Sequence, residues 1–288
     1  MNTKRSLSLF LGLFLSLSVA CSSISLPGLQ KIETGTTETF ILNEPAPGTG
    51  TIQDVALQVT VGDLTLSGGA DALLEGEIHY NVKDWEPTII SKGNSLTVTQ
   101  GERNFTVDGF PADDVVNSWD VSLGDIPVNL ILEAGAYDAR LDLSGIPLRS
   151  LIVQDGASDA EIRFDTLNPE QMRTLAYQTG ASQITFLGLA NANFTQMSFE
   201  GGTGEYTFDF SGDLQQDANV DIQVGLSNVK IVVPAGVSAQ LVVEGGLGNI
   251  DVDDAWIRNG NHYENKGSGP QLTIVIELGA GSLDLTNE

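Results

Sequence analysis

The fold is decided by a stretch that reads MSFEGGTGEYTFDF at residues 197–210. Apolar and polar side chains alternate on both sides of Gly202, which is the pattern of two half-buried strands. The apolar positions before and after this glycine are Met197, Phe199, Tyr206, Phe208 and Phe210. The stretch therefore predicts two strands that face one interior and meet at a glycine.

The same arrangement recurs through the second half of the chain. A glycine returns at intervals of 21, 24, 22, 23, 21 and 33 residues, at Gly135, Gly156, Gly180, Gly202, Gly225, Gly246 and Gly279. Apolar residues stand five and three positions before nearly every one of these glycines, and four and six positions after it. Such a period indicates a solenoid. We expect an all-β, single-stranded-repeat β-solenoid with two strands per rung of about 22 residues, stacked rung upon rung in parallel ladders.

Each repeated glycine has a geometric explanation. A turn between two strands needs either a positive φ or a close approach of two backbones, and glycine accepts both. Within the connection after the rung of Gly156, Asn168–Gln171 reads NPEQ, which predicts a capped helical turn.

The chain divides into four parts. Residues 1–20 are expected to be a signal peptide and residues 21–49 a flexible tether rich in Ser, Thr, Gly and Pro. Residues 50–122 alternate without the regular glycine period, so we expect an N-terminal β cap, and residues 123–288 are expected to hold the solenoid repeats. A cap protects exposed strand edges from aggregation.

The N-terminal sequence predicts export. MNTKRSLSLFLGLFLSLSVAC, residues 1–21, has a basic start, an apolar run of 14 residues from Leu7 to Ala20, and the chain's single Cys at its end. The run is shorter than the roughly 20 residues that span a bilayer. It is similar to a bacterial lipobox, which implies lipid attachment at Cys21, although Ser18 stands where Leu is commonest. The alternative is an ordinary signal peptide cleaved nearby.

Charge and composition exclude several classes of function. Without Lys4 and Arg5, 11 basic residues face 38 acidic ones, a balance of −27. Such a surface repels phosphates and anionic headgroups, so no nucleic acid is expected as a partner. One Cys excludes an intrachain disulfide framework and thiolate metal clusters, and two His leave little material for catalytic triads. No cofactor, metal site or catalytic residue is expected.

The sequence resembles known bacterial families. Residues 61–89 and 117–164, with Trp85-Glu86-Pro87 and Trp119, are similar to the toast-rack N-terminal family, and the later rungs resemble the solenoids of "putative adhesin" domains and of the LiaF C-terminal domain. The resemblance implies a β-solenoid in the cell envelope. LiaF-type regulators carry several membrane helices, and this sequence has no comparable run.

Three chemical alternatives were weighed against structural explanations. Gly201-Gly202-Thr203-Gly204 and Gly245–Asn249 suggest calcium-binding β-roll turns, but Tyr206 and Ile250 stand where the ligand Asp is needed. The pairs Asp113-Asp114 and Asp253-Asp254 suggest metal ligands or a general acid and base, but adjacent pairs are expected by chance among 38 carboxylates. A polysaccharide-acting β-helix enzyme would need acidic and basic residues gathered on one face, whereas Arg140, Arg163 and Lys230 fall in different rungs. Loose calcium binding among outward rows of Asp is a further alternative.

The longest rung holds the best candidate for a ligand loop. Between Gly246 and Gly279 it contains Trp256, Arg258, Asn261, His262 and Tyr263, which together suit a sugar or a protein surface. The alternative, which we favour, is that Trp256 plugs the end of the core.

These observations predict a non-catalytic cell-envelope lipoprotein that displays an adhesin-like module outside the cytoplasmic membrane. Its partners would be the membrane, through the N-terminal lipid, and a cell-wall polymer or an envelope protein. The alternative is an accessory regulator of an envelope stress response.

Overall fold

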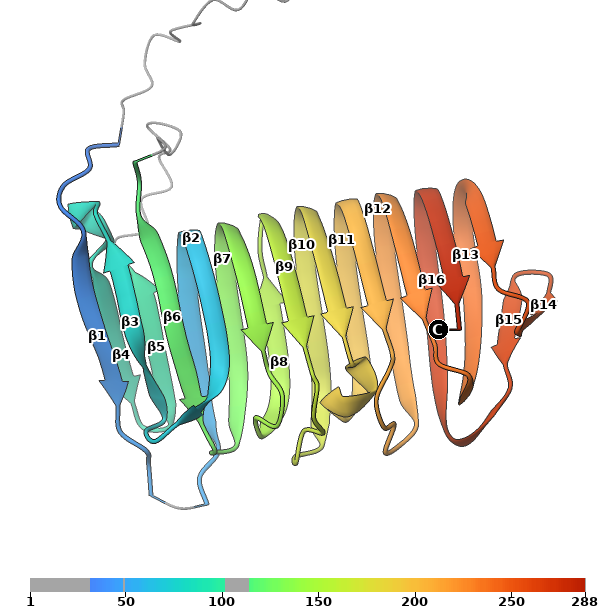
Figure 1. Cartoon of the computed structure of the whole chain (residues 1–288), viewed down its shortest axis with the longest axis horizontal. Coiled ribbons are helices and arrows are strands. Elements are labelled where there is room, and N and C mark those ends of the chain that lie inside the picture. The colour runs from blue at the N-terminus through green and yellow to red at the C-terminus, as the bar shows by residue number, and fades with distance from the viewer. Residues whose placement is uncertain (1–31, 49, 102–113, 288) are drawn as a thin grey trace, which may run out of the picture.

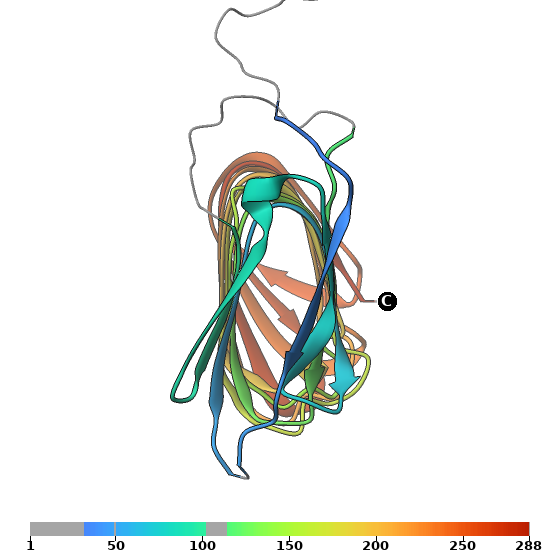
Figure 2. The ribbon, with the colours of Figure 1, turned by 90° about the vertical axis from the view of Figure 1, so that its left-hand side faces the viewer.

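The computed structural model describes residues 32–48, 50–101 and 114–287, and its strands form one sixteen-stranded sheet. The sheet is wound into a flattened coil with two long walls around a narrow interior (Figures 1 and 2). Two short 3-10 helices, η1 (Lys83–Trp85) and η2 (Leu189–Ala192), are the only helical elements in those ranges. None of the helices described there is long and apolar enough to cross a membrane. The expected all-β solenoid is confirmed.

Most rungs of the coil are single long strands that bend in the middle. The two expected strands per rung are therefore two halves of one strand, and only the third rung is divided, into β8 and β9. Neighbouring rungs pair in parallel and in register. In spatial order the rungs are β2 (Gln53–Ala70), β7 (Val128–Asp142), β8 (Leu148–Gln154) with β9 (Ala157–Arg163), β10 (Met172–Leu187), β11 (Phe194–Asp209), β12 (Ala218–Val232), β16 (Gly267–Thr286) and β13 (Gly236–Val252).

The repeated glycines form a ridge where the rungs bend, along the upper edge in Figure 1. A Cβ on Gly180 would stand 2.5 Å from the carbonyl oxygen of Gly156, and one on Gly225 would stand 2.5 Å from that of Gly202. Of the two explanations for the glycines, close backbone approach is therefore the one that applies along the ridge. Gly246, in the last rung, is the exception, because its φ is +94°.

The ridge separates two walls, which keep their names below. The first wall consists of the strand segments before the ridge glycines, and the second wall of the segments after them. Along every rung, successive side chains alternate between the interior and solvent. The interior positions are those the alternation predicts, and they are buried from Leu130 and Leu132 in β7 to Leu283 and Leu285 in β16.

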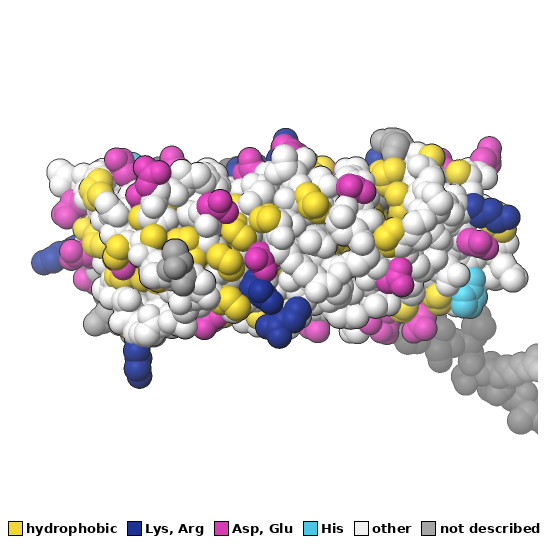
Figure 3. Space-filling model, turned by 90° about the horizontal axis from the view of Figure 1, so that it is seen from below, with side chains coloured by type: hydrophobic (Ala, Val, Ile, Leu, Met, Phe, Trp, Pro, Cys, Tyr) yellow, Lys and Arg dark blue, Asp and Glu magenta, His cyan; other side chains and the backbone are white. Residues whose placement is uncertain are grey.

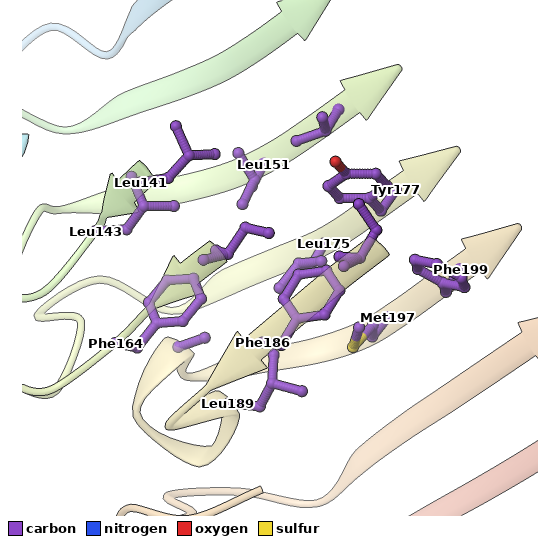
Figure 4. Packing of buried hydrophobic residues seen from close by; sticks show 14 of the residues in the cluster. Leu141, Leu143, Leu151, Phe164, Leu175, Tyr177, Phe186, Leu189, Met197 and Phe199 are labelled. Carbon is purple, nitrogen blue, oxygen red and sulfur yellow. The ribbon is translucent and has the colours of Figure 1, made fainter. Parts of the chain in front are cut away.

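The middle of the core is aromatic (Figure 4). Phe199 packs edge-on against Tyr206 and Phe208, with ring centroids 4.8 and 4.9 Å apart. Phe186 stacks on Phe208 of the next rung at 5.6 Å. Edge-to-face and offset stacks of this kind add about 0.5–1.5 kcal/mol per pair to the burial of apolar area.

Five shorter strands, in mixed parallel and antiparallel pairing, close the N-terminal end. β6 (Asn117–Gly124), β3 (Leu74–Tyr80) and β1 (Glu38–Glu44) extend the second wall, and β5 (Ser95–Gln100) and β4 (Pro87–Lys92) extend the first. β1 lies inside residues 21–49, which were expected to form a flexible tether. The expectation is wrong for Glu38–Glu44, because these residues form a strand. Phe40 and Leu42 pack on the core, and their alternation with polar neighbours produces a strand despite the polar composition.

The rungs at the C-terminal end are not stacked in chain order. After β13 the chain forms a hairpin of β14 (Trp256–Asn259) and β15 (His262–Asn265), and β16 then returns between β12 and β13. The expectation of sequential stacking is corrected here. The 33-residue interval before Gly279 is the length that this excursion requires.

The helical turn expected at Asn168–Gln171 is absent. Asn168 is fully buried, and its side chain joins three segments: Nδ2 donates to the carbonyl oxygens of Leu148 and Ala192, and Oδ1 accepts from Leu148 N and Glu170 N. These bonds hold the connection in an irregular path. The helical turn lies one rung later instead, at η2.

Candidate functional site

The β14–β15 hairpin carries all five residues of the expected ligand loop. Trp256 and Tyr263 are 5% and 2% exposed and belong to the hydrophobic core. β15 pairs with β13 over Ala239–Val242, so the hairpin continues the first wall past the last rung. Trp256 thus seals the C-terminal end of the core, the structural role favoured from the sequence.

Two polar residues of the hairpin, Arg258 and Asn261, also make contacts within the protein. The Arg258 guanidinium lies over the Tyr263 ring, 5.6 Å from its centroid, and its Nε donates to Gly260 O at 3.1 Å. Asn261 Nδ2 donates to Val243 O at 2.9 Å. His262 is exposed, as is Ile257 on the other strand of the hairpin. The five residues share one hairpin but form no aromatic platform, because both rings face inward.

A different set of residues forms the most regular surface feature. Two positions before the ridge, one outward side chain from every rung is Gln or Glu, and we call this set the ridge row. Its members, in spatial order, are Gln58, Glu133, Gln154, Gln178, Glu200, Gln223, Glu277 and Glu244. The period of the glycines also marks this row, because seven of its eight members stand two positions before a repeated glycine.

Amide–carboxylate hydrogen bonds run along the ridge row. Gln58 Nε2 donates to Glu133 Oε2 at 2.8 Å, and Gln178 Nε2 donates to Glu200 Oε2 at 3.1 Å. Glu133 and Glu200 each have Gln on both sides, which avoids the like-charge contacts that destabilise cross-strand pairs. Only Glu277 and Glu244, in the last two rungs, are acidic neighbours.

A shallow groove lies between this row and the ridge. It has a volume of about 420 Å³ and is lined by Gln178, Glu200, Gln223, Glu277 and the glycine backbone of the same rungs. Because the ridge glycines carry no side chains, the groove gives open access to main-chain and side-chain polar groups. Its chemistry is that of hydrogen bonding, with both amide donors and carboxylate acceptors.

A polar cluster lies just inside the ridge. Asp155 accepts hydrogen bonds from the Tyr177 hydroxyl at 2.6 Å and the Ser158 hydroxyl at 3.1 Å, and also from Thr179. Burial raises the pKa of Tyr177 well above its ordinary value, and the nearby Tyr137 and Asp155 raise it further. The cluster replaces apolar packing beneath the bend with a hydrogen-bond network.

The acidic residues do not assemble into a metal site within the described ranges. No group of three or more His, Cys, Asp or Glu side chains there has metal-binding geometry. Asp113 and Cys21 lie outside the described residues. Among the basic residues weighed for an enzyme, Arg140 contacts Asp159 at 3.5 Å and Arg163 contacts Glu161 at 2.8 Å. His79 contacts Thr39 and Glu77.

Acidic side chains are spread along the molecule. Figure 3, which looks onto the edge opposite the ridge, shows Asp and Glu over its whole length and Lys and Arg at few places. A field of this sign attracts basic partners and repels anionic ones.

Three solved structures are similar to this chain. A "putative cell adhesion protein" from Clostridium sporogenes is 21% identical, with a TM-score of 0.49 over 88% of this chain and 99% of that chain. A "putative adhesin" from Bacteroides fragilis is 11% identical, with a TM-score of 0.33 over 87% and 97%. A "putative lipid binding protein" from Parabacteroides distasonis is 9% identical, with a TM-score of 0.39 over 88% and 99%. No curated protein matches the sequence.

One family is identified directly. Residues 33–174 match the family described as the N-terminal domain of toast_rack. The matched stretch runs from the N-terminal cap through the first three rungs and into β10. Just under half of the chain, residues 33–174, is therefore similar to the toast_rack N-terminal family.

Proposed function

We propose that this protein is a non-catalytic lipoprotein of the cell envelope that displays an adhesin-like binding surface outside the cytoplasmic membrane. Cys21 would carry the lipid, and the residues between Cys21 and β1 would form the tether. The basic start, the apolar run and the position of the single Cys support this assignment.

The ridge row with its groove is the observation that carries the proposed binding role. The row places one amide or carboxylate side chain in each rung, so these groups repeat from rung to rung at the strand spacing of about 4.8 Å. An extended polymer laid along the groove would meet alternating amide and carboxylate groups from one rung to the next. Hydroxyl groups of an uncharged glycan pair with both kinds of group, whereas a phosphate- or uronate-rich polymer is repelled by the acidic surface.

Binding by this surface requires no chemical step. The rungs are held by continuous backbone ladders and an interdigitated core, so the row is fixed before the ligand arrives. A preorganised row loses little side-chain entropy on binding, which favours affinity. The mechanism is display of a rigid, repetitive surface, with the tether holding it near the membrane.

The experiment measures retention of the purified protein on cell-wall glycan from its own host, by co-sedimentation. A ridge-row variant changes Gln178, Glu200, Gln223 and Glu277 to Ala. A matched control changes the polar outward residues of the same rungs on the same wall to Ala, namely Thr174, Gln196, Asn219 and Thr273. We expect loss of retention only in the ridge-row variant. Equal retention of both variants, or none by the unchanged protein, would refute the proposed site.

A further inference from the structure

The last rung lacks a neighbour along half of its length. β13 pairs with β16 on one side throughout, but β15 covers its other side only over Ala239–Val242. In the part of the chain that the structure describes, Gly246–Val252 has no strand on its outer side. The second wall thus ends in an open strand edge, while the hairpin extends the first wall beyond it (Figure 1).

The core beneath this edge is incompletely covered. Ile250 and Val252 point inward but are only partly buried. Their partners in β16, Leu283 and Leu285, are 1% and 0% exposed. The difference arises because Leu283 and Leu285 lie between two rungs, whereas Ile250 and Val252 have a rung on one side only.

We propose that the open edge at Gly246–Val252 binds an extended, basic polypeptide segment of another molecule by strand addition. Unpaired main-chain groups on such an edge accept a strand through backbone hydrogen bonds, and pockets for alternate side chains give selectivity. Apolar side chains of the segment would cover Ile250 and Val252. Its outward side chains would pass the exposed carboxylates of Asp251, which accepts from Val252 N at 3.1 Å, and Asp253, which accepts from Asn287 N at 2.9 Å. Their negative charge favours Lys or Arg at those positions.

Charge disfavours a second copy of this chain as the occupant. Two copies joined through this edge would place Asp251 and Asp253 of both copies on one short two-stranded ladder. A head-to-tail contact would bring them to β1, whose ends are Glu38 and Glu44. Like charges across neighbouring strands are destabilising. The projecting hairpin also restricts access on the first wall, so the edge suits a thin segment better than a folded end.

The test uses the full-length protein, purified in detergent, and three synthetic heptapeptides. VKVKVKV is the probe, VEVEVEV reverses its charge, and VKVPVKV places a proline at the centre, where it removes a backbone donor. We expect VKVKVKV to bind with an affinity that falls as salt rises, and to slow hydrogen exchange of the amides at residues 246–252. The other two peptides should bind about tenfold more weakly or not at all.

Two protein variants locate the contact. Ile250→Lys places a charge at the inward position of the edge and should abolish peptide protection at residues 246–252. Ile41→Lys, a matched change at the exposed position of the N-terminal edge strand, should leave it unchanged. The proposal fails if no peptide binds, if binding is the same in both variants, or if protection appears away from β13. Circular dichroism confirms that each variant is folded.

Discussion

A Cβ atom on Gly202 would stand only 2.4 Å from the carbonyl oxygen of Gly180 in the preceding rung. The same contact repeats from rung to rung, so the backbones stack along the ridge without intervening side chains. This packing fixes the bend of each rung against the one before it. It also leaves the groove beside the ridge row open.

Gly202→Ala tests the ridge directly. Its Cβ would collide with main-chain atoms that cannot rotate away, so we expect the free energy of unfolding to fall by about 1–3 kcal/mol. Gly48→Ala is the control, because a Cβ there meets nothing within 4 Å. Urea unfolding followed by circular dichroism measures both. Equal stability of the two variants would show that the ridge tolerates a side chain.

Asn168→Ala tests the polar junction that replaces the expected helical turn. The substitution removes four hydrogen bonds from a fully buried side chain and leaves the main-chain groups of Leu148 without those partners. We expect a loss of about 1–3 kcal/mol or more in the free energy of unfolding. Asn168→Asp should also destabilise, because a carboxylate cannot donate to the two carbonyl oxygens. Thermal unfolding of both variants gives the answer, and a wild-type midpoint for Asn168→Asp would contradict the assigned bonds.

Trp256→Ala distinguishes a core plug from a ligand platform. Removing a buried indole is expected to cost about 3–5 kcal/mol of stability. His262→Ala, on the same hairpin but exposed, should change stability by less than about 0.5 kcal/mol. Chemical denaturation of the two variants measures the contrast. Unchanged stability of the Trp256→Ala variant would contradict the role of Trp256 as a core plug and would favour the hairpin as a binding surface.

Tyr137 is expected to make the free energy of unfolding depend on pH in the alkaline range. Burial raises the pKa of its phenol well above the ordinary value, and the Asp155 carboxylate raises it further. The native state therefore keeps the proton after the unfolded chain has lost it. The contribution of Tyr137 to the free energy of unfolding is therefore complete below about pH 10 and is lost as the pH rises beyond that value.

We therefore expect the free energy of unfolding to fall more steeply between about pH 9.5 and pH 11 for the unchanged protein than for Tyr137→Phe. Urea titrations across this range provide the slopes. Parallel slopes would show that the native and unfolded states bind this proton equally.

The repeat made most of the fold predictable. Constant spacing between Gly202 and its apolar neighbours specifies which residues face inward, because side chains alternate strictly along a strand. It does not specify which rungs adjoin, since every rung presents the same pattern to its neighbours. The position of β16 between β12 and β13 could therefore not be predicted, although the 33-residue interval showed where the repeat becomes irregular.

The candidate site was harder to predict than the fold. Trp256 and Tyr263 have the composition of a binding loop, and only their burial shows that they close the core. β1 was missed because Phe40 and Leu42 form a short alternation within polar sequence. The ridge row becomes visible only when the rungs are aligned on their repeated glycines, because alternation within one strand reveals no such row.

The central claim, display of a binding surface at the cell envelope, is tested most directly by cross-linking the tagged protein in its own host and identifying what is recovered. We expect wall glycan to be recovered with the unchanged protein, and we expect Cys21→Ala to abolish lipid labelling and to release the protein from the membrane fraction. Recovery of an envelope sensor protein without glycan would contradict the central claim and would favour a regulatory role instead.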